Sequence, residues 1–240
     1  MTSPRGAVAA ITTSRAGRRR AGTLVAIVAG AAVLVGCSAP AGPAPDRVPG
    51  RTAAAEPSAT AVSRGTFAAV GDSITDADSP DFAAGDLGPG SWATYVVADG
   101  VEFAGGWAEW GATTEQMAAS VAPVEADALV VLAGTNDLAF GISFEVSAAN
   151  LDRIVRTVGI DDVLVASIPP FTAVPAAAEA YNASLEELAD DRGWRFVDAS
   201  AGLRTADGRF AEGMSSDGLH PSEAGARVLG EAIGAALRED

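Results

Sequence analysis

The 240-residue sequence has no lysine, a single histidine, His220, and a single cysteine, Cys37. Without lysine, neither a P-loop nor a Schiff-base site can form. One histidine and one cysteine are too few for a zinc site of the usual Cys/His kind, so we predict neither a metal nor a cofactor. A single cysteine also excludes an intrachain disulfide, so the fold must be stabilised by its core alone.

Positive charge is scarce throughout the chain. The sequence has 16 basic and 31 acidic residues, with a formal net charge of −15 at pH 7. Five of the arginines and none of the acidic residues precede Cys37, so a chain that begins there has an even larger negative charge. Because phosphate binding requires a basic surface, we expect no nucleic-acid partner.

The N-terminus resembles a bacterial lipoprotein signal. Arginines without acidic residues precede an apolar run over 24–35, which is shorter than the roughly 20 residues of a transmembrane helix. The run ends at Leu34-Val35-Gly36-Cys37, which resembles a lipobox. We therefore predict a signal peptide over 1–36, a lipid on Cys37, and an exported protein anchored to the outer face of the cell membrane. The alternative is a buried helix or uncleaved anchor with a chance cysteine.

A composition change separates this leader from the folded part. Residues 37–65 comprise Cys37 and a segment rich in Ala, Pro, Ser, Thr and Gly, with almost no large apolar side chains. Such a segment buries too little surface to order itself. We predict a flexible tether here and one folded domain over 66–240. An ordered extension on the domain is the alternative.

The domain alternates predicted strands and helices. Short apolar runs predict strands over 67–70, 101–103, 126–133, 162–168 and 195–197. Amphipathic patterns predict helices over 91–97, 143–158, 176–191 and 221–237, the last beginning at Pro221. This alternation is typical of an α/β fold with a parallel sheet covered on both faces.

Four short segments with reactive or glycine residues follow predicted strands. They are Gly71-Asp72-Ser73, Trp110-Gly111-Ala112-Thr113, Gly134-Thr135-Asn136-Asp137 and Asp217-Gly218-Leu219-His220-Pro221. In open α/β sheets, ligands bind at the carboxyl ends of the strands. Each segment alone is more often a tight turn or a cap, but their common placement predicts one site.

These residues match the needs of acyl transfer. Ser73 can be the nucleophile, and His220 is the one imidazole that could serve as its base. Asp217 is close enough in sequence to hold the ring in one tautomer. The backbone N–H of Gly111 and the carboxamide of Asn136 are donor types that an oxyanion hole uses.

The four segments resemble the family blocks of the SGNH, or GDSL, hydrolases, over roughly residues 66–238. The resemblance implies a flavodoxin-like three-layer α/β/α sandwich of about five parallel strands. It implies a Ser73–His220–Asp217 triad, with the Ser73 N–H, the Gly111 N–H and the Asn136 side chain as oxyanion donors. Gly111 is the preferred block II glycine over Gly105 or Gly106. The G-x-S-x-G elbow of ordinary α/β-hydrolases is absent from the sequence.

The substrate is less defined by these motifs. We predict a monomeric esterase that removes short acyl groups such as acetyl from glycans, with Asp72, Trp107 and Trp110 as substrate contacts. Core packing is the alternative for both tryptophans. A lipid esterase, a thioesterase or an acyltransferase of the same fold is the alternative activity, and a surface binding lipoprotein without turnover is the alternative class.

Overall fold

The computed structural model describes residues 65–239. The predicted signal peptide, the lipidated Cys37 and the tether up to residue 64 lie outside the described residues. Between residues 65 and 239, no helix is both long and apolar enough to cross a membrane.

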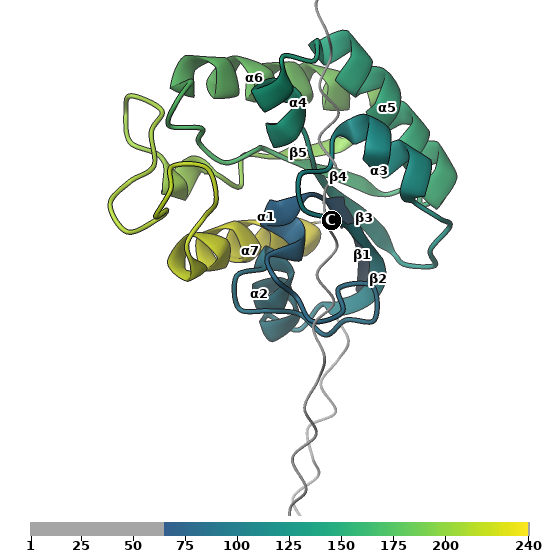
Figure 1. Cartoon of the computed structure of the whole chain (residues 1–240). Coiled ribbons are helices and arrows are strands. Elements are labelled where there is room, and N and C mark those ends of the chain that lie inside the picture. Colours follow the sequence, from purple (N-terminus) through teal and green to yellow (C-terminus); the bar gives the residue numbers. More distant parts are fainter. Residues whose placement is uncertain (1–64, 240) are drawn as a thin grey trace, which may run out of the picture. The chain divides into compact units, whose positions relative to one another are not determined.

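Five parallel strands form one sheet, with the order β2-β1-β3-β4-β5 (Figure 1). This is the flavodoxin-like order. The chain adds β2 on one side of β1 and the remaining strands, beginning with β3, on the other side. The predicted fold class is confirmed. The strands are β1 (Thr66–Gly71), β2 (Glu102–Ala108), β3 (Ala128–Leu132), β4 (Val163–Ala166) and β5 (Arg195–Val197).

Helices cover both faces of the sheet (Figure 1). The helices α3 (Thr114–Ser120), α5 (Phe144–Val158) and α6 (Pro175–Arg192) lie on one face, and α2 (Trp92–Ala98) and α7 (Glu223–Leu237) on the other. Strand side chains alternate between the two layers: in β3, Leu129 and Val131 face the first layer, whereas Val130 and Leu132 face the second. Burial on both faces explains why this strand has a continuous apolar sequence.

Four short helices were not predicted. The structure has α1 (Ser73–Asp76), α4 (Thr135–Phe140) and the 3₁₀ helix η1 (Ala201–Leu203) in addition to α3. None of these is long enough to show a clear helical period in the sequence. The start of α3 is nevertheless marked by a capping box between Thr113 and Gln116.

The start of α7 differs from the prediction. Ser222, not Pro221, precedes the first helical residue, and its hydroxyl accepts a hydrogen bond from the Gly225 N–H at 3.2 Å. The serine hydroxyl can accept a hydrogen bond from a free helix N–H, whereas the side chain of proline has no acceptor. Pro221 therefore lies just outside the helix, in the same turn as His220.

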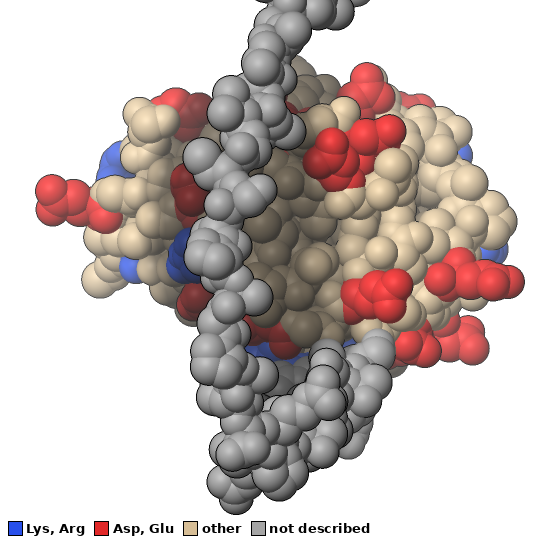
Figure 2. Space-filling view, turned by 90° about the horizontal axis from the view of Figure 1, so that it is seen from below, with Lys and Arg blue, Asp and Glu red and all other residues tan. Residues whose placement is uncertain are grey.

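Acidic side chains dominate the charge visible on the surface. On the face shown in Figure 2, red Asp and Glu side chains are spread widely and blue side chains are fewer. The blue residues are all arginines because the chain has no lysine. Such a surface is unfavourable for polyanions at low ionic strength.

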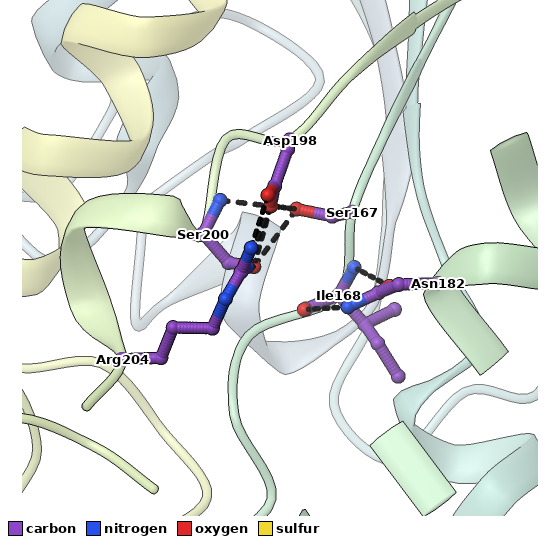
Figure 3. Close-up of polar contacts among 6 residues, drawn as sticks. All are labelled: Ser167, Ile168, Asn182, Asp198, Ser200 and Arg204. Carbon is purple, nitrogen blue, oxygen red and sulfur yellow. Dashed lines mark hydrogen bonds and ion pairs between the residues drawn. The ribbon is translucent and has the colours of Figure 1, made fainter. Parts of the chain in front are cut away.

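A polar cluster joins the carboxyl ends of β4 and β5 (Figure 3). Arg204 donates to Asp198, and Ser167, which follows β4, donates to Ser200 at 2.9 Å. Beside this cluster, the Asn182 side chain bonds both the N–H and the carbonyl of Ile168, at 2.8 and 3.0 Å. These contacts fix the ends of two strands and connect α6 to the sheet.

Candidate active site

The sharp turn after β1 places Ser73 at the carboxyl edge of the sheet. Asp72 caps α1, where its carboxylate accepts a hydrogen bond from the Ile74 N–H at 3.0 Å. Ser73 is the first residue of α1, so its own N–H is one of the helix N–H groups without an intrahelical partner. The serine therefore presents a hydroxyl and a free backbone donor at the same point.

The structure brings Ser73, His220 and Asp217 together. The Ser73 Oγ lies 3.0 Å from the His220 Nε2, and the His220 Nδ1 lies 2.7 Å from an Asp217 carboxylate oxygen. Ser73 and His220 are 147 residues apart in sequence. The two distances give a continuous hydrogen-bonded path from hydroxyl to carboxylate.

Asp217 is held as an acceptor by the turn that contains it. One carboxylate oxygen accepts the N–H groups of Leu219 and His220, at 2.9 and 2.8 Å. Desolvation raises the pKa of Asp217, but hydrogen bonds from the His220 ring and from these two backbone N–H groups together hold the pKa well below its usual range. The group is therefore ionised at neutral pH and can stabilise a protonated imidazole.

Asn136 lies beside the serine in the first turn of α4. Its amide nitrogen donates to the Ala112 carbonyl at 3.0 Å and to an Asp72 oxygen at 3.3 Å. An amide has two N–H groups, so both are occupied in this state. The longer bond, to Asp72, is the one that a developing oxyanion would displace more easily.

Gly111 lies in the exposed loop after β2, next to Trp110. Its φ of 72° favours glycine, and no hydrogen bond from its N–H is found within residues 65–239. Gly105 and Gly106 instead lie within β2, paired with Ala68 and Ala69 of β1. Only Gly111 among the three has the loop position that an oxyanion donor requires.

Ser73 and His220 both line a small cavity. Its volume is about 160 Å³. Trp110 is half exposed in its wall, and its ring centroid lies 5.1 Å from that of His220, at 36°. The lining residues are Ser73, Ile74, Ala77, Asp78, Gly90, Trp110, His220 and Pro221.

The structure does not bring two predicted substrate contacts, Asp72 and Trp107, into the lining of the Ser73 cavity. Asp72 has no exposed surface, because its carboxylate is turned inward to cap α1 and to accept from Asn136. Trp107 is part of β2, packs against the core with α3 and α5, and lines a separate apolar cavity of about 90 Å³. The placement of Trp107 thus favours the core-packing alternative, whereas Trp110 lines the Ser73 cavity.

The sequence comparison agrees with this geometry. Residues 69–228 match the GDSL-like lipase/acylhydrolase family. The chain belongs to this family. It is therefore an ester-hydrolysing enzyme, and the matched span contains every residue of the site described above. A search of curated proteins finds no match to this hydrolase.

Solved structures of GDSL proteins share the fold of this hydrolase. A G-D-S-L family member from Veillonella parvula is 18% identical, with a TM-score of 0.55, and the match covers 70% of this chain and 95% of that one. An acetylxylan esterase from Geobacillus stearothermophilus is 18% identical, with a TM-score of 0.58, over 73% and 95% of the two chains. A GDSL-like lipase from Bacteroides thetaiotaomicron is 18% identical, with a TM-score of 0.54, over 72% and 88%.

The sequence did not reveal a buried carboxylate behind the site of this GDSL hydrolase. Asp137 has no exposed surface and accepts hydrogen bonds from the Thr114 N–H at 2.9 Å and the Ser147 hydroxyl at 2.6 Å. It therefore joins α4 to α3 and α5. The one available signal was Ser147 on the inward face of a predicted helix, where a polar residue needs a partner.

Asp78 was also missed as a cavity residue. It follows α1 and lines the Ser73 cavity, yet nothing in its spacing or neighbours predicts this position. Its placement depends on the backbone turn after α1, which the sequence alone does not specify.

Proposed function

We propose that this hydrolase cleaves esters through an acyl-enzyme on Ser73. The observation that carries the proposal is the path from the Ser73 hydroxyl through His220 to Asp217. His220 Nε2 takes the proton of the hydroxyl as its oxygen attacks the ester carbonyl. The protonated ring, stabilised by Asp217, then gives the proton to the leaving alcohol. Water then attacks the acyl-enzyme. His220 takes a proton from the water and returns it to the Ser73 oxygen as the acid leaves.

Three donors are candidates for binding the negative oxygen of the intermediate. We assign these to the Ser73 N–H, the Gly111 N–H and the Asn136 amide. The first is a free helix N–H, and the second has no partner within the described residues. The third would exchange its 3.3 Å bond to Asp72 for a bond to the oxyanion.

The cavity at Ser73 must hold the acyl group together with the nearest part of the alcohol, so its size favours a short acyl group. Its 160 Å³ is below the roughly 300–1,000 Å³ of sites that enclose drug-sized ligands. A long lipid chain would have no enclosed path there, so we favour acetyl over fatty acyl esters. The exposed Trp110 ring offers a face for a sugar, and an acetylxylan esterase is among the structural neighbours, which supports a glycan alcohol.

We also propose that the enzyme acts as a monomer at the outer face of the cell membrane, held by a lipid on Cys37. The support is the basic, apolar and lipobox-like N-terminal pattern. A lipid with several acyl chains provides firm anchoring, since each buried CH₂ contributes about 0.8 kcal/mol.

Replacing the nucleophile tests the mechanism. In Ser73→Ala we expect hydrolysis of p-nitrophenyl acetate to fall by roughly 10⁴-fold or more, and labelling by a fluorophosphonate probe to disappear. The exposed Ser120 provides a matched control, because Ser120→Ala lies outside the site and should keep both signals. Turnover retained by Ser73→Ala would contradict the proposal.

A comparison of acetyl and octanoyl esters tests the preference for short acyl groups. We expect the ratio of kcat/KM for p-nitrophenyl acetate over p-nitrophenyl octanoate to be well above one. A ratio below one would contradict the short-acyl assignment and favour a lipid esterase.

A further inference from the structure

The segment after the nucleophile helix has an unusual backbone. Ala77, with φ 44°, and Asp78, with φ 58°, are the two non-glycine residues of positive φ in the part of the chain that the structure describes. L-residues rarely adopt this conformation, although aspartate tolerates it better than most. Such residues persist where the surroundings hold them, and they gather at functional sites.

Contacts on two sides hold this segment in place. The Ala77 N–H donates to the Ser73 carbonyl at 2.9 Å, and the Gly88 N–H donates to the Ser79 hydroxyl at 3.0 Å. A Cβ on Gly90 would lie 3.2 Å from the Ala77 Cβ, which is a tight contact, so glycine allows the close approach of this loop. The position of Asp78 is thus tied to the backbone of the nucleophile itself.

Asp78 differs from the other carboxylates of the site. Asp72 is fully buried, and Asp217 is bonded to His220. Asp78 is exposed and lines the Ser73 cavity, and within residues 65–239 its carboxylate makes no hydrogen bond or ion pair. It is therefore a charge in the substrate cavity that the chain leaves available to a ligand.

We propose that Asp78 is a specificity residue that selects the alcohol half of the ester. This rests on the proposed function, in which Ser73 holds the acyl half. A carboxylate accepts hydrogen bonds from hydroxyl or ammonium groups and repels anions. Together with the exposed Trp110 ring, it favours hydroxyl-rich or cationic alcohols over anionic ones.

A charge series of acetate esters tests this selection. The substrates are acetylcholine, its neutral isostere 3,3-dimethylbutyl acetate, and anionic sulfopropyl acetate. We expect the cation-to-anion ratio of kcat/KM to fall by roughly five- to tenfold in Asp78→Asn, as expected for a solvent-accessible charge pair. The matched control is Asp161→Asn, which removes an equal charge just before β4, at the opposite edge of the sheet, and should leave the ratio unchanged.

A second pair of variants separates hydrogen bonding from charge. Asn and Gly both accept a positive φ, but only Asn keeps a side-chain acceptor. With a monoacetylated methyl xyloside, we expect kcat/KM to fall severalfold more in Asp78→Gly than in Asp78→Asn. Equal losses in the two variants would overturn the hydrogen-bonding part of the proposal.

Fluorophosphonate labelling distinguishes the two possible failures. If the wild type and Asp78→Asn are both labelled and their cation-to-anion ratios are equal, the role of Asp78 is overturned and the proposed function stands. If the wild type is not labelled and hydrolyses no ester of the series, both proposals are overturned.

Discussion

Asp72 and Asp217 are two carboxylates of one site with opposite environments. Asp217 is half exposed and bonded to an imidazole and two backbone N–H groups, which favour its charged form. Asp72 is fully buried, and burial raises its pKa from the ordinary 3.8 to about 6, against the lowering effects of the Ile74 N–H and of His220. At the residue scale, burial rather than residue type decides which carboxylate can serve the histidine.

The raised pKa of Asp72 predicts a pH-dependent stability. Between about pH 4 and 6 the folded protein keeps a proton that the unfolded chain releases, so this group lowers the free energy of unfolding as the pH rises. Asp72→Asn lacks this titration. Relative to wild type, its free energy of unfolding should therefore improve from pH 4 to pH 7, by at most about 3 kcal/mol.

Urea unfolding at several pH values measures this difference. Asp161→Asn, an exposed carboxyl, is the control and should follow the wild-type profile. Parallel profiles for Asp72→Asn and wild type would show that Asp72 titrates normally.

At the scale of elements, the close contact of Gly134 with α6 explains the glycine before α4. Gly134 has a φ of 124°, and a Cβ there would lie 2.3 Å from the Tyr181 ring and hydroxyl. We expect Gly134→Ala to lower the free energy of unfolding by about 2–4 kcal/mol, through overpacking added to backbone strain.

Gly141 is the matched control for this substitution. It also has positive φ, 69°, but apart from its neighbours along the chain no heavy atom lies within 4 Å of the point where a Cβ would be. Gly141→Ala should therefore cost only the strain, about 1 kcal/mol. Equal losses in urea denaturation of the two variants would show that the contact with Tyr181 contributes nothing.

Asp137 connects three helices, so its loss should destabilise the layer that contains α3 and α5. Asp137→Ala leaves the buried Thr114 N–H and Ser147 hydroxyl without their acceptor. We expect a loss of about 3 kcal/mol or more in chemical denaturation, since buried donors left without their acceptor are costly. The exposed Asp161→Ala should stay within about 0.5 kcal/mol of wild type.

At the scale of the whole molecule, we propose that the N-terminal pattern directs the enzyme to the outer face of the cell membrane. We expect Cys37→Ser to move the protein from the membrane fraction to the soluble fraction of the producing cells and to abolish incorporation of radiolabelled fatty acid. Its kcat/KM for p-nitrophenyl acetate should match wild type, because the substitution lies outside the catalytic domain. Membrane association retained by Cys37→Ser would contradict lipid anchoring.

Most of the fold was predictable from local patterns. The strands β1, β3 and β4 were found because a strand buried on both faces is continuously apolar over its length. The strand β2 is partly exposed, and the prediction over 101–103 covered only its beginning. The long helices α5 and α6 were found from their inward apolar residues. The short helices α1 and α4 were missed because four to six residues contain too few turns for a period.

The sequence by itself determined the chemistry of this protein: one imidazole, a serine after a strand, and an aspartate three residues before the histidine leave few other assignments. Only the tertiary structure decided which nearby residues share the site. It buried Asp72, packed the partly buried Trp107 against the core, and placed Trp110 and Asp78 in the wall of the cavity. The physical reason is that residue types and spacing specify reactivity and local turns, whereas burial and the direction of a side chain depend on contacts between segments far apart in the chain.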